Sequence, residues 1–320
     1  MSEPDLLAVE DLSVAYLTDA GPVAALNGVT FSIRAGEVFG LVGESGSGKS
    51  TLAQSLLRVL AAPAVITGGR VLYRGRDVLG MGEGELRAFR WRHVSLVPQS
   101  AMSALSPLHT AGAQIADAIR AHEAISRHRL ERRVAGLLKL VGLDPARAAS
   151  YPHELSGGMR QRVVIAMALA LGPALVVLDE STAALDVVLQ QEILGQLAAL
   201  KESLGFSVLF ISHDLALTLG NPTRVGVLYA GRLVEVAPAA SLRLAPAHPY
   251  TRALLACTLD PRRPRGELRG IAGAPPDPLR LPTGCAYHPR CPSVFERCRE
   301  ERPLLVRIGA DRERACHLPP

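Results

Sequence analysis

A glycine-rich loop near the amino terminus has the residue types of a phosphate-binding site. Gly43–Thr51 fits the pattern G-x-x-x-x-G-K-[ST], between a short apolar run at 38–42 and a helical pattern at 52–60. Its glycines let successive N–H groups turn toward phosphate oxygens, and the positive end of the following helix points to the same place. Lys49 would reach the β- and γ-phosphates, and the Ser50 hydroxyl would bind Mg²⁺. The positions expected to touch the nucleotide are Gly43, Ser45, Gly46, Gly48, Lys49, Ser50 and Thr51.

Two carboxylates stand at the end of a later apolar run, 175–178. They are Asp179 and Glu180, and a buried parallel strand presents such residues at its carboxyl end, where open α/β sheets bind ligands. Asp179 would hold the metal, directly or through water, and Glu180 would polarise the attacking water. Taken together, the two segments disfavour the alternatives of an incidental glycine turn and of two acids that merely end a strand.

A second helix start suited to phosphate lies at Leu155–Gln161. Ser156 can cap the helix, and Gly157 and Gly158 let backbone N–H groups approach a ligand without side-chain obstruction. One protein that holds one nucleotide does not need two such helix starts. The arrangement makes sense if the second serves a nucleotide held by another subunit.

Alternating strands and helices are expected to position these residues. Short strands are predicted over about 5–40, strands at 174–178 and 207–211, and a helix over 187–204 between them. This order predicts the α/β class, with a largely parallel sheet covered by helices. The segment 225–236 predicts a hairpin that turns at Ala230-Gly231.

The chain is predicted to comprise two domains. Residues 1–250 form the first, with a helical subdomain inserted at about 101–160. Residues 251–320 form a small extension, because proline and arginine become frequent there and all five cysteines occur in it, four of them within 285–316.

Together these segments resemble the nucleotide-binding domain of an ABC ATPase, over about residues 5–250. The resemblance implies a P-loop NTPase core that binds and hydrolyses ATP with Mg²⁺. Gly43–Thr51 resembles the Walker A loop, Asp179 the Walker B aspartate and Glu180 the catalytic base. Leu155–Gln161 resembles the signature motif, which in this family caps ATP bound to the opposite subunit.

Four further positions match motifs of the family. Gln99 resembles the Q-loop glutamine, which senses Mg²⁺ and couples to membrane subunits, and Asp186 in Ala184-Leu185-Asp186 resembles the D-loop. His213 resembles the switch histidine that contacts the γ-phosphate, and Tyr16 the aromatic residue that stacks on adenine. Taken singly, His213 and Tyr16 also fit purely structural roles. One position departs from the family, since Ser181 stands where proline is common, and we expect altered loop rigidity rather than lost hydrolysis.

Motifs outside the shared core resemble the oligopeptide/dipeptide importer branch and its nickel-importing relatives. They are Gly43-Glu44-Ser45-Gly46-Ser47-Gly48, Ser103-Ala104-Leu105-Ser106-Pro107, Leu185-Asp186-Val187, His248-Pro249-Tyr250-Thr251, Leu281-Pro282-Thr283-Gly284-Cys285, His288-Pro289-Arg290-Cys291-Pro292 and Cys316-His317-Leu318-Pro319. The resemblance implies two transmembrane permease subunits, a second ABC ATPase (a paralogue or a second copy), and an extracytoplasmic peptide-binding protein. It also implies a peripheral location at the cytoplasmic face of the membrane. Nickel import stays open as the alternative.

The extension at residues 251–320 is called the tail below. Four of its cysteines, Cys285, Cys291, Cys298 and Cys316, favour a metal site. Disulfides are not expected, because the amino terminus predicts no signal peptide. Four thiols in a segment too small for its own apolar core indicate a metal staple, against the alternative of scattered buried thiols. Thiolate ligation suits an iron–sulfur cluster or Zn²⁺, and the branch resemblance favours [4Fe–4S].

The charge pattern, the apolar stretches and the number of cassettes argue against several other classes of protein. The net charge is +5 with basic and acidic residues interspersed, which argues against a nucleic-acid partner. The longest apolar stretch, 165–178, is interrupted by Gly172-Pro173 and is too short to span a bilayer. ABC ATPases that act on DNA insert long coiled coils, and no sustained heptads occur here. Translation-factor ABC proteins carry two cassettes, and this chain has one.

Overall fold

The computed structural model describes residues 5–99, 104–181, 186–215, 222–257 and 270–319. The chain divides into two compact units. The first unit comprises residues 1–80 and 210–320, and the second unit comprises residues 81–209. The chain returns from the second unit to the first within strand β8 (Ser207–Ser212).

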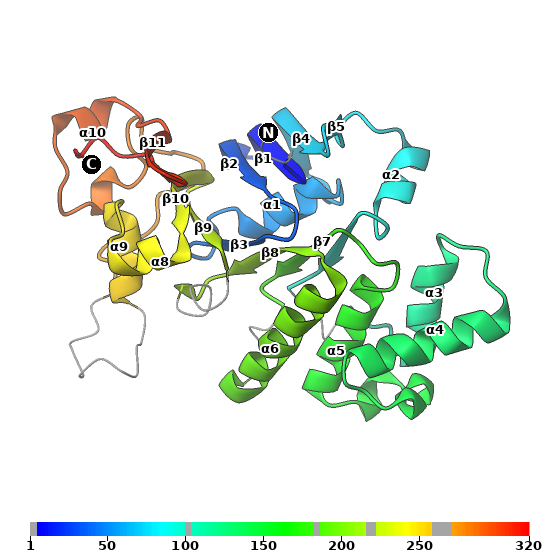
Figure 1. Ribbon diagram of the computed structural model, residues 1–320. Helices are drawn as coiled ribbons and strands as arrows, with labels where there is room; N and C mark the ends of the chain where they lie inside the picture. Colours follow the sequence, from blue (N-terminus) through cyan, green and yellow to red (C-terminus); the bar gives the residue numbers. More distant parts are fainter. Residues whose placement is uncertain (1–4, 100–103, 182–185, 216–221, 258–269, 320) are drawn as a thin grey trace. The chain divides into compact units, whose positions relative to one another are not determined.

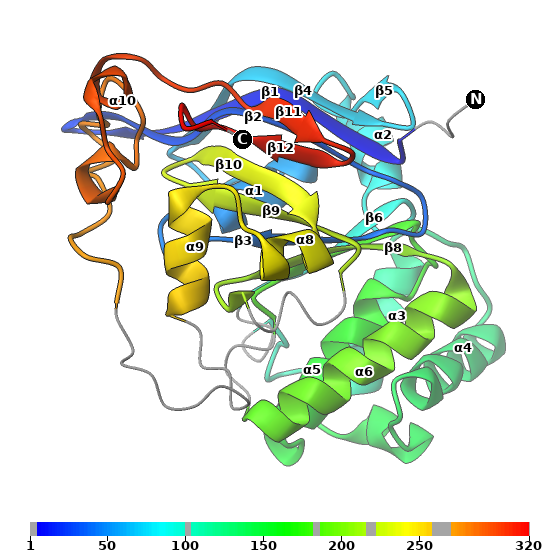
Figure 2. The ribbon, with the colours of Figure 1, turned by 60° about the vertical axis from the view of Figure 1, so that its left-hand side comes forward.

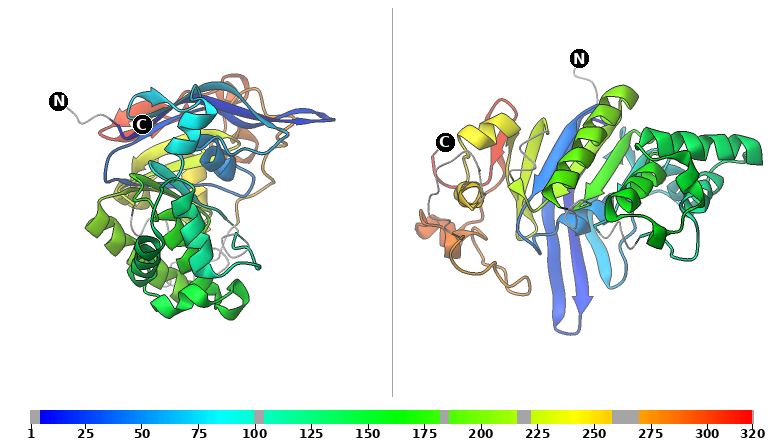
Figure 3. Two further views of the ribbon diagram at one scale, coloured as in Figure 1. Left: turned by 90° about the vertical axis from the view of Figure 1, so that its right-hand side faces the viewer. Right: turned by 90° about the horizontal axis from the view of Figure 1, so that it is seen from below.

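An antiparallel sheet forms the amino-terminal part of the first unit. Its strand order is β2-β1-β4-β5, with β1 at Leu7–Thr18, β2 at Gly21–Ile33, β4 at Ala64–Tyr73 and β5 at Arg76–Asp77. The sequence of β1 alternates buried and less buried side chains over its first half, as expected for a sheet with one face against a core. Strands β1 and β2 form a long hairpin (Figure 3).

A second sheet of the first unit carries the phosphate loop. Strand β3 (Val38–Val42) pairs in parallel with β9 (Arg224–Tyr229), which pairs antiparallel with β10 (Arg232–Pro238). Ala230 and Gly231 both have positive φ angles, 47° and 74°, as a two-residue hairpin turn requires. The predicted hairpin is therefore confirmed.

The end of the chain extends this second sheet. Strand β12 (Arg312–Arg314) pairs with β10, and β11 (Val306–Gly309) pairs with β12 (Figure 2). Among the described residues, the helices of the first unit are α1 (Lys49–Leu56), α8 (Ala239–Leu244), α9 (Pro249–Ala256), the 3₁₀ turn η4 (His288–Arg290) and α10 (Glu296–Glu300).

Three tyrosines join the tail to the core of the first unit. Tyr229 on β9, Tyr250 on α9 and Tyr287 before η4 are each at most 2% exposed. Their ring centroids lie 4.6 to 5.3 Å apart. The tail from 285 onward therefore shares apolar packing with the sheet.

The second unit combines a parallel strand pair with helices. Strands β6 (Val94–Val97) and β7 (Leu175–Asp179) pair in parallel. The helical elements that its described part contains are α2 (Glu83–Phe89), α3 (Ala111–Arg120), α4 (Arg127–Leu140), η2 (Pro145–Ala149), η3 (Pro152–Glu154), α5 (Gly157–Ala168) and α6 (Val187–Leu204). Helices α3, α4 and α5 pack on one another, and α5 also contacts α6 (Figure 1). Across the described residues, no helix has the length and hydrophobicity needed to cross a membrane.

Candidate functional site

The backbone of the phosphate loop, Gly43–Thr51, requires glycine at several positions. Gly46 and Gly48 have φ angles of 76° and 106°, in the left-handed region that glycine tolerates. A Cβ on Gly43 would lie 2.2 Å from the Leu228 carbonyl oxygen, and one on Gly48 would lie 2.5 Å from the Ala25 carbonyl oxygen. Side chains at these two positions would therefore displace the loop from the strands beneath it.

The donors of the phosphate loop fit a polyanionic ligand. Helix α1 begins at Lys49, so the N–H groups of its first turn, which have no intrahelical partner, lie at the loop. Lys49 is 4% exposed, and its ammonium donates to the carbonyl oxygens of Gly43, at 2.9 Å, and Glu44, at 3.0 Å. The Ser47 hydroxyl is buried without a hydrogen-bond partner among the described residues. A triphosphate would supply the acceptors that these donors need.

Tyr16 on β1 lies beside the start of α1. Its phenolic oxygen is 3.1 Å from the hydroxyl oxygen of Thr51, and the side chain is half-buried. The structure thus places Tyr16 next to the last residue of the phosphate loop. His213, which belongs to the same unit, follows β8 and is exposed.

In the second unit, Asp179, Glu180 and Gln99 lie at the carboxyl ends of two paired strands. Because β6 and β7 run parallel with Val97 opposite Leu178, their carboxyl ends lie at one edge. Asp179 is 3% exposed, and the Gln99 amide donates to a Glu180 carboxylate oxygen at 3.0 Å. Carboxylate and amide oxygens are the ligands that Mg²⁺ prefers, so this edge fits a magnesium ion.

Glu180 has an unusual backbone conformation. Its φ angle is 44°, a region that residues with a side chain adopt rarely and at a cost of about 1–3 kcal/mol. Such conformations cluster at functional sites, where they aim a side chain. Ser181, which departs from the family pattern, follows it as a buried residue.

The second predicted helix start is formed as expected, with one feature that sequence reasoning missed. Ser156 is the N-cap of α5, and its hydroxyl accepts a hydrogen bond from the Met159 N–H at 3.3 Å. Gly157 is the first residue of that helix. A Cβ on Gly158 would lie 2.7 Å from a methyl carbon of Leu189 on α6. Gly158 is therefore needed for helix packing, and a pattern of residue types cannot show this contact.

The predicted D-loop is described only in part. Asp186 is the N-cap of α6, and its carboxylate accepts from the Leu189 N–H at 3.0 Å. Ala184 and Leu185, and the predicted branch motif residue Ser103, lie outside the described residues. The first unit thus holds Tyr16, the phosphate loop and His213, and the second holds Gln99, Ser156, Gly157, Gly158, Asp179, Glu180 and Asp186.

The predicted [4Fe–4S] cluster is wrong. The four tail cysteines line one small cavity and have free thiols, but among the described residues no group of three or more His, Cys, Asp or Glu side chains could hold a metal ion. The Zn²⁺ alternative lacks support for the same reason. Burial, reinforced by the neighbouring cysteines, raises the pKa of the Cys285 thiol to about 11. The tail needs no metal to hold it to the first unit, because Tyr287 packs with Tyr229 and Tyr250.

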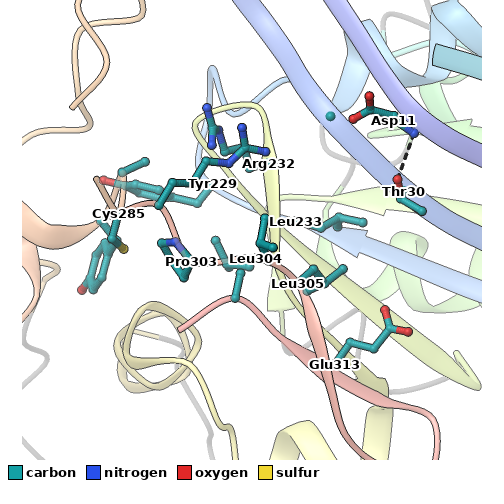
Figure 4. Close-up of a pocket in the computed structure, with 16 residues that line it drawn as sticks. Asp11, Thr30, Tyr229, Arg232, Leu233, Cys285, Pro303, Leu304, Leu305 and Glu313 are labelled. Carbon is teal, nitrogen blue, oxygen red and sulfur yellow. Dashed lines mark hydrogen bonds between the residues drawn. The ribbon is translucent and has the colours of Figure 1, made fainter. Parts of the chain in front are cut away.

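A pocket of about 420 Å³ lies between β2, β10 and the tail of the first unit. Figure 4 shows side chains of both signs around it, with Asp11, Arg232 and Glu313 at separate places in its lining. None of its lining residues belongs to the phosphate loop. It is therefore distinct from the candidate nucleotide site.

His248 gives the first unit a pH-dependent stability. Its side chain is 1% exposed and accepts a hydrogen bond from the Tyr250 N–H at 3.0 Å. Burial, with a smaller effect of Arg314, lowers its pKa from 6.5 to about 3. Between pH 6.5 and about pH 3, His248 is protonated in the unfolded chain but neutral in the folded chain. The contribution of His248 to stability is therefore fully present above pH 6.5 and decreases as the pH falls from 6.5 to about 3.

We expect this residue to reduce the free energy of unfolding by about 1.4 kcal/mol for each pH unit below about 6. Urea unfolding at several pH values, for the wild type and His248→Gln, measures the effect. The variant should show a shallower dependence on pH. Identical dependence in both proteins would contradict the assignment of a buried neutral imidazole.

Two family models match the chain. The model described as "ABC transporter" matches residues 26–183. The model described as "Oligopeptide/dipeptide transporter, C-terminal region" matches residues 234–298. The first match contains the phosphate loop, Gln99, the second helix start and both carboxylates.

Curated relatives match nearly the whole chain. A probable peptide ABC transporter ATP-binding protein, y4tS of Sinorhizobium fredii, is 44% identical over 98% of this chain and 90% of its own length. The oligopeptide transport ATP-binding protein OppD of Salmonella typhimurium is 40% identical over 98% and 94%. The dipeptide transport ATP-binding protein DppD of Escherichia coli is 38% identical over 98% and 97%.

Solved structures show the same fold. The dimeric bacterial ABC transporter cassette MJ0796 superposes with a TM-score of 0.66 at 28% identity, over 73% of this chain and 98% of the cassette. The subunit cbiO1 of Clostridium perfringens, part of the ABC transporter complex cbiONQ, gives a TM-score of 0.64 at 27% identity, over 75% and 91%. The predicted α/β P-loop NTPase fold is confirmed. The chain belongs to the ATP-binding subunits of ABC transporters and is an ATPase of that family.

Proposed function

We propose that the chain is the ATP-hydrolysing subunit of an ABC importer that takes up dipeptides or oligopeptides. The observation that carries the proposal is similarity along nearly the full chain to peptide transport ATP-binding proteins. The match of residues 234–298 to the C-terminal region of oligopeptide/dipeptide transporters supports it independently of the shared ATPase core.

The phosphate loop is proposed to bind ATP. Its inward N–H groups and the start of α1 would hold the phosphate oxygens, and Lys49 would exchange its bonds to loop carbonyls for bonds to phosphate. Ser50, Gln99 and Asp179 are the proposed Mg²⁺ ligands. When bound, Mg²⁺ would neutralise charge on the phosphates. Tyr16 is proposed to stack on adenine.

Glu180 is proposed to accept a proton from the attacking water, and His213 to contact the γ-phosphate. The Gln99 amide donates to the Glu180 carboxylate, which holds that carboxylate at the end of β7. A carboxylate fixed in this way can orient water rather than turn freely in solvent.

The second helix start is proposed to act on a nucleotide bound to another subunit. Ser156 and Gly157 would present N–H groups of α5 to its γ-phosphate, with Gly158 beside them and Asp186 at the neighbouring start of α6. The solved relative MJ0796 is a dimer, and one of its structures is a post-hydrolysis state bound to ADP and Pi. The second subunit here is proposed to be a paralogue or another copy of this chain.

The remaining partners are proposed to be two transmembrane permease subunits and, indirectly, an extracytoplasmic peptide-binding protein. The ATPase would then lie at the cytoplasmic face of the membrane, held by the permeases. The proposed domains remain residues 1–250, with the helical segment at about 101–160, and residues 251–320. Nickel import is not favoured, because the curated relatives described above are named for peptide transport.

Growth of a deletion strain tests the proposed substrate class. A strain that needs one amino acid should grow on a dipeptide or oligopeptide containing it only when the gene is present. Growth on the free amino acid serves as the control and should not change. Normal growth on all peptides, combined with a defect under nickel limitation, would contradict peptide import.

A further inference from the structure

Arg290 in the tail forms a bidentate ion pair with Glu44 of the phosphate loop. One guanidinium nitrogen donates to a Glu44 carboxylate oxygen at 2.7 Å, and the other donates to the second oxygen at 3.0 Å. The Arg290 side chain is 4% exposed and that of Glu44 is 24% exposed. Because the pair is largely shielded from water and has fork geometry, it is stronger than a surface ion pair.

Acceptors surround the whole Arg290 guanidinium. Besides Glu44, it donates to the Ala272 carbonyl at 3.0 Å, the Ile271 carbonyl at 3.4 Å and the Tyr229 hydroxyl at 3.3 Å. These contacts use every N–H direction that a guanidinium offers. A lysine ammonium could not reproduce them, so the site is specific for arginine.

Tyr250 holds the same loop residue through its backbone. The Glu44 N–H donates to the Tyr250 hydroxyl at 3.0 Å. Tyr250 is fully buried, and its ring lies 4.6 Å from that of Tyr229 and 5.3 Å from that of Tyr287. The Arg290 guanidinium and the Tyr250 hydroxyl, which both bind Glu44, are therefore held in place by packing in the core of the first unit.

Glu44 connects these contacts to the phosphate-binding lysine. It follows Gly43, and the Lys49 ammonium donates to the carbonyl oxygens of both residues. The segment between Glu44 and Lys49 contains Gly46 and Gly48, both with positive φ angles. Such glycines lose more conformational freedom on ordering than other residues, so an external anchor has a large effect on the loop.

We propose that Arg290 and Tyr250 are positioning residues that hold the phosphate loop ready for nucleotide through Glu44, so that the integrity of the tail sets the affinity for ATP. The inference rests on the proposed role of Gly43–Thr51 in nucleotide binding. A loop already ordered by the tail gives up less freedom when ATP binds, and binding is tighter as a result. By reciprocity, bound ATP must also stabilise the contact between tail and loop.

The test measures the dissociation constant for ATP of the full chain by competition with a fluorescent nucleotide. Arg290→Gln and Glu44→Gln should each weaken ATP binding by roughly tenfold, within the range that coupled sites show. Arg290→Lys should lose less, because it keeps the charge. The matched control is Arg297→Gln, which breaks the exposed tail pair between Arg297 and Glu301 and should bind ATP as the wild type does.

The double variant Glu44→Gln with Arg290→Gln separates positioning from general loss of structure. If the two side chains act as one unit, the double variant binds ATP about as well as either single variant. Thermal denaturation of each variant reports folding independently. Hydrogen exchange provides a second readout, since ATP should slow exchange of the amides around 285–298 in the wild type but not in Glu44→Gln.

The ATP affinities of the wild type and the variants distinguish failure of this inference from failure of the proposed function. Equal ATP affinity in the wild type, Arg290→Gln and Glu44→Gln would overturn the inference while leaving the proposed nucleotide site intact. Absence of ATP binding by the wild type would instead contradict the proposed function. Additive losses in the double variant would show that the two residues act separately, and would also overturn the inference.

Discussion

Replacing Glu180 by glutamine should lower the rate of ATP hydrolysis by about 10²- to 10⁴-fold, the usual contribution of a general base. Glutamine has nearly the same shape as glutamate but cannot take a proton from water. The contact with Gln99 can persist, because an amide oxygen still accepts a hydrogen bond. ATP binding should therefore survive, and the variant should accumulate with ATP bound and with paired subunits.

Phosphate release by the transporter assembled with its partner subunits measures this effect, and gel filtration with ATP detects the paired state. Glu202→Gln is a matched control, because Glu202 lies exposed on α6. It should hydrolyse ATP at the wild-type rate. Unchanged turnover in Glu180→Gln would remove this residue from the catalytic role.

Replacing Lys49 by methionine should lower the catalytic efficiency for ATP by about 10²- to 10³-fold, as the loss of one fixed donor to developing charge does. The Lys49 ammonium is buried in the loop and already points its donors at the carbonyls of Gly43 and Glu44. ATP offers it stronger, charged acceptors. Methionine keeps the length of the side chain and removes only the charge and the donors.

Nucleotide affinity and steady-state hydrolysis are the readouts for this variant, with thermal denaturation as the check on folding. Lys139→Met serves as the control, because Lys139 is exposed on α4. It should leave both readouts unchanged. A Lys49→Met variant that is folded and binds and hydrolyses ATP normally would mean that the loop is not the nucleotide site.

The local parts of the fold could be predicted from the sequence because neighbouring residues determine them. An apolar run followed by Gly43–Thr51 indicates strand, loop and helix, and β3 and α1 lie there. The turn at Ala230-Gly231 was recognisable because glycine accepts a positive φ angle. The same holds for Ser156, whose hydroxyl caps a helix within its own chain segment.

Contacts between distant segments could not be predicted in this way. The ion pair between Glu44 and Arg290 joins residues 246 positions apart, and each residue alone resembles an ordinary surface charge. Gly158 appeared to keep a ligand path clear, whereas the structure shows that Leu189 fills the space beside it. Such roles depend on packing, which a pattern of residue types does not contain.

The error at the tail cysteines has a related cause. Four cysteines in a short segment indicated a metal staple because the tail has few apolar residues of its own. Tyr287 nevertheless packs with Tyr229 and Tyr250, and β12 pairs with β10. The tail is thus stabilised by a core that it shares with the sheet, which residue counts within the tail alone could not show.

A structure of the ATP-loaded transporter, determined with the Glu180→Gln variant, would show whether the starts of α1 and α5 both contact nucleotide, and whether they do so in facing subunits. We expect Ser156 to lie within hydrogen-bond distance of a phosphate oxygen held by the phosphate loop of the opposite subunit. A nucleotide whose phosphates contact one subunit alone, with Ser156 exposed to solvent, would contradict it.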